Sequence, residues 1–134
     1  MEFFQSIDLS EPSDDVSHHA VLILSSDALA AALLGAAVEL AGHVPHFSRQ
    51  GEPARGALLR VRPKLVLIDC DYEEGCTDEF VGPVLMTGGK VLLFRSRRTE
   101  IDRTEFAERL SLRVVEMPLE HRELTTLLKE MLAD

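Results

Sequence analysis

Two carboxylates, Asp69 and Asp71, follow a run of four large aliphatic residues, Leu65 to Ile68. A run with no polar face predicts a strand that is covered on both sides, as in a parallel sheet packed between helices. Ligands and chemistry in such sheets lie just beyond the carboxyl ends of the strands. Asp69 therefore stands where a functional site is expected, and its role depends on the partners that the other strand ends bring to it.

The loop after Asp69 is rich in acid and could attract a cation. Its carboxylates are Asp69, Asp71, Glu73, Glu74, Asp78 and Glu79. The loop does not fit a calcium-binding pattern, because Glu74 occupies the position that needs glycine and Phe80 the position that needs a bidentate glutamate. We therefore interpret this loop as a solvated acidic rim.

Other residue types that could do chemistry lack companions. Cys70 follows Asp69 in the strand and is expected to face the interior, which disfavours a redox role with Cys76. The histidines do not make a closed metal site; they are His18, His19, His43 and His46. A basic patch is expected to be a solvated loop facing the acidic loop, with a phosphate or partner contact as the alternative; it consists of Arg95, Arg97, Arg98 and Arg103.

The elements that must position these residues alternate between strand and helix. Strands are expected at residues 19–25, 44–48, 65–69, 90–94 and 112–117. A first helix, capped by Ser26 or Asp27, is expected over 28–41, and a second over 52–61. A third is expected to begin after Thr77 or Asp78 and to be interrupted at Pro83; two more should cover 104–110 and 122–133. This alternation predicts a doubly wound α/β sheet.

The bulk composition is that of one globular domain. The chain has 134 residues, 46% of them apolar, and a net charge of −9 that argues against non-specific nucleic-acid binding. No apolar run approaches the roughly 20 residues that span a bilayer. With only two cysteines and no signal peptide, we expect a cytoplasmic location. Residues 1–18 are interpreted as a mobile arm and residues 19–134 as the domain.

Three segments resemble landmarks of the response-regulator receiver domain, the flavodoxin-like fold of the chemotaxis switch protein. The segment 21–27 matches the first strand and the acidic pair that ends it, and 63–69 matches the strand that bears the phosphorylated aspartate. Met117-Pro118-Leu119, followed by Leu124, matches the element before the last helix. The resemblance implies a five-stranded parallel sheet with strand order 2-1-3-4-5, and Asp69 as the equivalent of the phospho-acceptor.

The departures from the receiver pattern concern the groups that phosphorylation needs. A carboxylate that attacks a phosphoryl group brings two anions together, so a magnesium ion and a fixed ammonium must neutralise the charge. Here Ser25 and Ser26 replace the acidic pair, and Met117 replaces the lysine. After the fourth strand, receivers carry a residue with a hydroxyl group; Arg95 occupies that position here, and Ser96 is the next residue. We hypothesise that Arg95 pairs with Asp69 and supplies the missing charge.

Three further residues near the site carry weaker expectations. Asp27 could stand in for the lost acidic pair, but helix capping is the expected role. Asp71 and Pro118 occupy positions of the altered site without a role of their own.

The sequence therefore favours a non-enzymatic, phosphorylation-independent interaction module of a two-component-type pathway, without a cofactor. The rival hypothesis is an atypical receiver that is phosphorylated on Asp69 with Mg²⁺. A small nucleotide- or flavin-binding enzyme is a weaker alternative, because the turn from Leu24 to Leu29 has no glycine to approach a pyrophosphate. Both a stand-alone regulator and a fragment of a longer protein remain open.

The expected first helix is apolar on almost every side. Glu39 is its only charged residue between 28 and 41. We expect Leu29, Leu33, Ala37 and Leu40 to face the sheet, which leaves an apolar outer strip consisting of Ala31, Leu34, Ala36 and Val38. Such a strip suggests a homodimer or a partner helix. The alternative is that small alanine side chains cover little area and that the N-terminal arm hides them.

Overall fold

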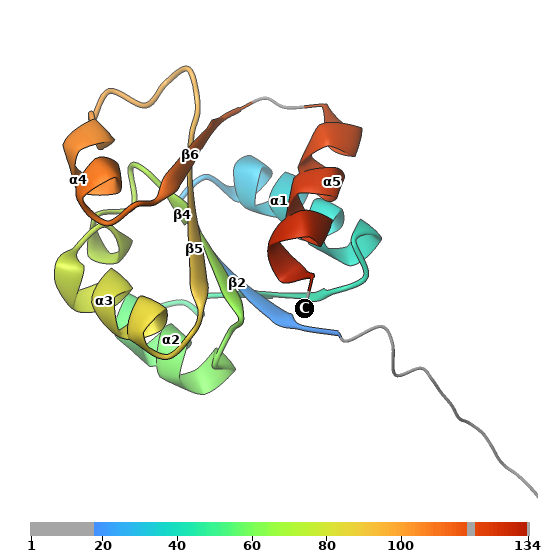
Figure 1. Cartoon of the computed structure of the whole chain (residues 1–134), viewed down its shortest axis with the longest axis horizontal. Helices are drawn as coiled ribbons and strands as arrows, with labels where there is room; N and C mark the ends of the chain where they lie inside the picture. The colour runs from blue at the N-terminus through green and yellow to red at the C-terminus, as the bar shows by residue number, and fades with distance from the viewer. Residues whose placement is uncertain (1–17, 118–119, 134) are drawn as a thin grey trace, which may run out of the picture.

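The structure is a computed structural model, which describes residues 18–117 and 120–133. Five parallel strands form one sheet in the order β3-β2-β4-β5-β6 (Figure 1). They are β2 (Ala20–Leu24), β3 (Val44–Phe47), β4 (Leu65–Asp69), β5 (Lys90–Arg95) and β6 (Arg113–Glu116). The predicted order 2-1-3-4-5 is confirmed. Apart from His18, the predicted N-terminal arm lies outside the described residues.

Strand β4 lies at the centre of the sheet and is buried over its whole length. Its residue Ile68 lies beside Leu24 of β2 and Leu93 of β5, so aliphatic side chains are neighbours across three strands. A strand covered on both faces needs no polar side, which explains the unbroken aliphatic run before Asp69.

Helices cover both faces of this sheet (Figure 1). Helices α1 (Ala28–Leu40) and α5 (His121–Leu132) contribute to the core on one face. The opposite face carries α2 (Ala54–Val61), α3 (Asp78–Met86) and α4 (Thr104–Arg109), and a short 3₁₀ turn, η2 (Glu73–Gly75), precedes α3. No helix in the described part of the chain is both long enough and apolar enough to cross a membrane.

The beginning of α1 confirms the predicted cap, but the course of α3 differs from the prediction. Asp27 accepts hydrogen bonds from the backbone N–H groups of Leu29 and Ala30, at 3.0 and 3.2 Å. Helix α3 passes through Pro83 without interruption and ends at Met86. Packing of its buried face against the sheet compensates for the one helical hydrogen bond that proline cannot make.

The predicted orientation of α1 is wrong. Leu34 and Val38, expected outside, are buried, while Leu29, Leu33 and Leu40, expected inside, are 70%, 49% and 60% exposed. Of the four residues expected to face the sheet, Ala37 is buried as predicted.

The other two residues of the predicted outer strip differ from each other. Ala31 packs against the core at partial exposure, and Ala36 is exposed as expected. The helix lies with Gly35 against the Phe47 ring, where an added Cβ would come within 2.9 Å of Cζ. Because the helix has almost no charged residues, its sequence does not define which face is inside.

Candidate functional site

Asp69 ends the central strand and is 7% exposed. Its Oδ2 accepts a hydrogen bond from the Ser25 hydroxyl at 3.0 Å, and its Oδ1 accepts one from the backbone N–H of Asp71, also at 3.0 Å. Both carboxylate oxygens are thus engaged by neutral donors. This arrangement satisfies a buried carboxylate without bringing a formal positive charge to it.

Ser25 joins two loops at this edge of the sheet. Besides donating to Asp69, its Oγ accepts a hydrogen bond from the backbone N–H of Asp27 at 3.0 Å. The Asp27 carboxylate is used by the first turn of α1, and Ser26 is exposed. The role of Asp27 is therefore the predicted helix cap, and the groups that face Asp69 from β2 are neutral.

Arg95 does not pair with Asp69, so the hypothesis of a compensating ion pair is wrong. Its guanidinium Nη2 donates to the backbone carbonyl of Thr99 at 3.2 Å, and no ion pair joins Arg95 to Asp69 in the described structure. The loop after β5 folds back on itself, because the buried Thr99 hydroxyl accepts the Ser96 N–H at 2.9 Å. The Thr99 carbonyl is then within reach of the guanidinium.

Arg103 reaches the site from the same loop, in keeping with the expectation that the basic patch faces the acidic loop. Its Nε donates to the backbone carbonyl of Cys70 at 3.0 Å, next to Asp69. Arg95 and Arg103 also line a cavity of about 270 Å³. The sequence predicted that the patch containing both residues faces the acidic loop but did not predict these contacts, since the reach of a side chain across a loop has no local signal.

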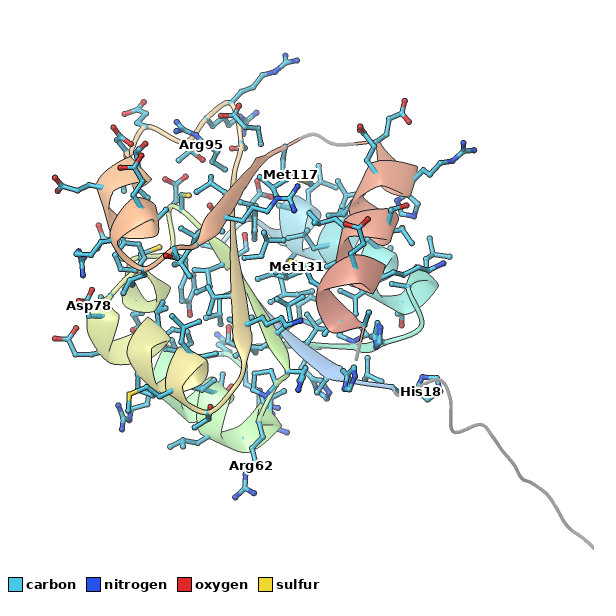
Figure 2. The ribbon with its side chains drawn as sticks, viewed as in Figure 1. His18, Arg62, Asp78, Arg95, Met117 and Met131 are labelled. Carbon is cyan, nitrogen blue, oxygen red and sulfur yellow. The ribbon has the colours of Figure 1, made fainter. Side chains whose placement is uncertain are left out.

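Met117 lies at the edge where β5 and β6 end, as Arg95 does (Figure 2). Its backbone N–H donates to the Arg95 carbonyl at 2.7 Å, and its half-buried side chain packs against the core beneath α1 and α5. A thioether carries no charge and is at most a weak hydrogen-bond acceptor. Pro118 lies outside the described residues.

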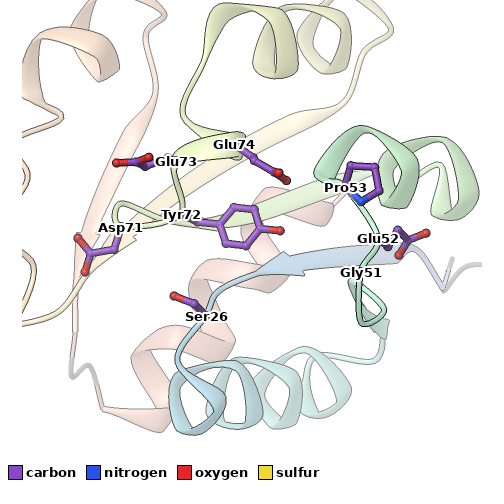
Figure 3. Close-up of a pocket in the computed structure, with 8 residues that line it drawn as sticks. All are labelled: Ser26, Gly51, Glu52, Pro53, Asp71, Tyr72, Glu73 and Glu74. Atoms are coloured by element: carbon purple, nitrogen blue, oxygen red, sulfur yellow. The ribbon is translucent and has the colours of Figure 1, made fainter.

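An acidic cavity of about 540 Å³ opens beside the site. Figure 3 shows its lining, in which the Tyr72 ring lies between Ser26 and Glu74. Two of its carboxylates hold the start of α2. Glu74 accepts the Ala54 N–H at 2.9 Å, and hydrogen bonds from the Arg60 side chain and the Arg49 backbone lower the pKa of Glu52 to about 2. The predicted solvated rim is thus partly structural.

The two cysteines are buried beside Asp69, and Cys70 faces the interior as predicted. Burial raises the pKa of Cys70 to about 11, and burial also raises the pKa of Cys76. Both groups are therefore neutral thiols near pH 7, which is unfavourable for nucleophilic or redox chemistry.

The histidines take part in local contacts at the other end of the sheet. The His18 ring bonds to the Gly42 carbonyl at 2.7 Å, and the His19 and His43 rings stack with centroids 5.4 Å apart. Over residues 18–117 and 120–133, no group of three or more His, Cys, Asp or Glu side chains is arranged to hold a metal ion.

Known structures share this architecture over most of the chain. NtrX from Brucella abortus superposes with a TM-score of 0.66 at 16% identity, over 87% of this chain and 26% of NtrX. The chemotaxis response regulator CheY4 of Vibrio cholerae gives 0.64 at 16% identity, over 87% of this chain and 100% of CheY4. A pilus assembly-related protein from Burkholderia pseudomallei gives 0.59 at 26% identity, over 84% of this chain and 87% of its own.

The chain has the receiver-domain fold. No protein-family model and no curated protein sequence matches it. This receiver-fold chain spans about a quarter of the length of NtrX. At these identities the likeness concerns the fold, so the chemistry of the site has to be argued from its own residues.

The donor atoms at Asp69 do not fit the magnesium ion that the receiver resemblance implies. Mg²⁺ is held by carboxylate or phosphate oxygens together with waters. At this site the groups contributed after β2 are the neutral hydroxyls of Ser25 and Ser26, so that strand end supplies no carboxylate to share the ion with Asp69. The receiver fold is therefore present with an aspartate whose hydrogen-bond donors are neutral.

Proposed function

We propose that the chain is a phosphorylation-independent interaction and signalling module of a two-component-type pathway. The observation that carries this proposal is the engagement of both Asp69 oxygens by the Ser25 hydroxyl and the Asp71 backbone N–H. A carboxylate that accepts a phosphoryl group has to expose an oxygen to it, and the developing negative charge has to be neutralised. Asp69 is 7% exposed, and the neutral donors at its oxygens do not neutralise that charge.

The positions that would supply positive charge support the same proposal. Met117 carries no ammonium, and Arg95 is bonded to the Thr99 carbonyl. Arg103 is bonded to the Cys70 carbonyl. Without a cation at Asp69 to support phosphorylation, the partner-binding surface keeps the shape that packing of the domain gives it. This role requires no enzymatic activity.

Acetyl phosphate with Mg²⁺ tests this proposal by intact-mass measurement. We expect no phosphoryl adduct on the wild type and none on Asp69→Asn. A triple variant, Ser25→Asp with Ser26→Asp and Met117→Lys, restores the charged groups of the receiver pattern and is expected to gain reactivity or magnesium affinity. An adduct on the wild type that is absent from Asp69→Asn would instead establish the atypical phosphorylated receiver.

The same sample tests the weaker alternative. Thermal-shift measurements with nucleotides and flavins are expected to give no change in Tm. A saturable rise in Tm would contradict the proposal, because a ligand that binds the folded state stabilises it.

A role in pilus assembly is a second candidate for the pathway. Two of the similar structures, from Burkholderia pseudomallei and Burkholderia thailandensis, are named for pilus assembly and are 26% and 25% identical to this chain. Removal of the gene from the native cell is expected to abolish pili, and complementation with Asp69→Asn is expected to restore them. Normal piliation after removal would reject this pathway and leave the module itself untouched.

A further inference from the structure

The outer face of α1 is an apolar stripe, formed by Leu29, Leu33, Ala36 and Leu40. Its leucines are 70%, 49% and 60% exposed, and Ala36 and the flanking Ala32 are exposed as well. A surface helix of a monomer normally presents polar residues to water. Three exposed leucines on one helix therefore mark a contact surface.

The residues of this stripe follow each other at intervals of four, three and four. This is the alternating spacing of the seam in a helical coiled coil, where each such residue meets the same kind of residue on a partner helix. The sequence of intervals is the same in both directions along the helix. An antiparallel pair of such helices therefore brings the stripe into register with itself.

We propose that α1 pairs with α1 of a second copy of this chain, in antiparallel orientation about a two-fold axis. In this pairing Leu29 lies opposite Leu40 of the second copy, and Leu33 lies opposite Ala36 of the second copy. A large side chain then faces a small one at the centre, which lets the helices approach closely. Each copy offers the same patch, as an isologous interface requires.

The charge on α1 favours the antiparallel arrangement. Glu39 is the one charged residue within the helix. Antiparallel pairing places Glu39 opposite Ala30 of the second copy. The two Glu39 positions are then nine residues apart along the axis, or about 13 Å, which exceeds the screening length of about 8 Å at physiological ionic strength. A parallel pair would place the two carboxylates at the same level along the axis.

The size of the stripe indicates a dimer whose population depends on the protein concentration. Its exposed apolar surface is on the order of 400 Å² per copy, about half of the roughly 800 Å² that each partner buries in a standard interface. The edge strand β3 offers a poor alternative for self-association, because Pro45 removes a backbone donor from it. Residues that flank α1 must supply the remaining contact.

Sedimentation of the full chain over a concentration series, up to about 1 mM, tests the dimer. We expect wild type to pass from monomer to dimer and Leu33→Glu to raise the dissociation constant at least about tenfold, because a charge would be buried at the centre. The matched control is Leu59→Glu on α2, a leucine 66% exposed on the opposite face of the sheet, which should leave the dissociation constant unchanged. Circular dichroism verifies that each variant is folded.

Cysteine cross-linking tests the orientation. A mixture of Leu29→Cys and Leu40→Cys copies is expected to form disulfides, because these positions face each other across the two-fold axis. Either variant alone places its introduced thiols about 16 Å apart, beyond the reach of a disulfide. Cross-links within the single variants and not in the mixture would overturn the antiparallel pairing.

The inference rests on the proposed function only in treating the domain as an interaction module. Its failure is separate from that of the phosphorylation test: a chain that stays monomeric at every concentration overturns the dimer, whatever acetyl phosphate does to Asp69. Deletion of residues 1–17 identifies the competing occupant of the stripe. If the deletion alone converts a monomer into a dimer, the N-terminal segment covers α1 and the second copy is not its native partner.

Discussion

At the residue scale, the decisive feature of this chain is the pair of hydrogen bonds to Asp69. The position of Asp69 could be predicted, because a strand buried on both faces must end where its first polar residue appears. Its partners could not, since they depend on how three loops fold over the strand end. The Ser25 hydroxyl reaches Asp69, while Arg95, the cation expected there, is taken by the Thr99 carbonyl.

Removal of the Ser25 hydroxyl is expected to destabilise the protein. Ser25→Ala leaves Oδ2 of a buried carboxylate without its donor and should lower the free energy of unfolding by about 1–3 kcal/mol. Ser26→Ala, a substitution of the exposed neighbour, is the control and should change it by less than about 0.5 kcal/mol. Urea unfolding measures both, and equal effects would show that the hydrogen bond contributes nothing.

The buried thiols predict a loss of stability in alkali. Cys70 has a pKa of about 11 when folded and an ordinary value of 9.0, so the folded state keeps the proton to higher pH than the unfolded state does. The stabilisation is therefore complete below pH 9 and is lost as pH rises to about 11.

The measurement compares slopes rather than absolute stabilities. Urea unfolding between pH 8 and pH 11 should show a weaker pH dependence for Cys70→Ala with Cys76→Ala than for the wild type. Identical slopes would mean that the thiols ionise equally in both states.

At the element scale, the strands were easier to predict than the faces of the helices. Strands β2, β4 and β5 are aliphatic runs typical of a buried parallel sheet, but α1 is apolar on all sides and gives no sign of its orientation. Its inner face is defined by the burial of Leu34 and Val38 and by the contact of Gly35 with Phe47 on the next strand. For α3, the proline signal was overridden by packing of Phe80, Val81 and Val84.

Gly89, just after α3, is expected to be sensitive to alanine. An added Cβ would lie 3.0 Å from the Val84 carbonyl oxygen, so Gly89→Ala should destabilise the protein by about 1–3 kcal/mol. Thermal unfolding measures the effect, and an unchanged Tm would contradict this account of the end of α3.

At the scale of the whole molecule, alternation of strands and helices was enough to predict the layered sheet, whereas the strand order was implied by the resemblance to receiver domains. Right-handed crossovers leave few ways to connect such elements. The surface was less predictable, because composition gives a net charge of −9 without placing it. The structure places several of the carboxylates around the cavity beside Asp69, whereas the outer stripe of α1 carries no charge.

This distribution predicts that salt strengthens self-association. Two copies that each carry −9 repel one another, and the proposed α1 contact contains no ion pair for salt to weaken. Raising ionic strength from 0.01 to 0.15 M shortens the screening length from about 30 to about 8 Å and should lower the dissociation constant. A dissociation constant that rises with salt would indicate attraction between opposite charges and a different interface.

The neutral hydrogen bonds at Asp69 also bear on time. The phosphorylated state of a switch protein has a limited lifetime, because its covalent bond breaks at a chemical rate. On the function proposed here, this domain has no phosphorylated state, so the duration of its signal equals the lifetime of its complex with a partner. The quantities that would describe it are the rates at which its complexes form and separate.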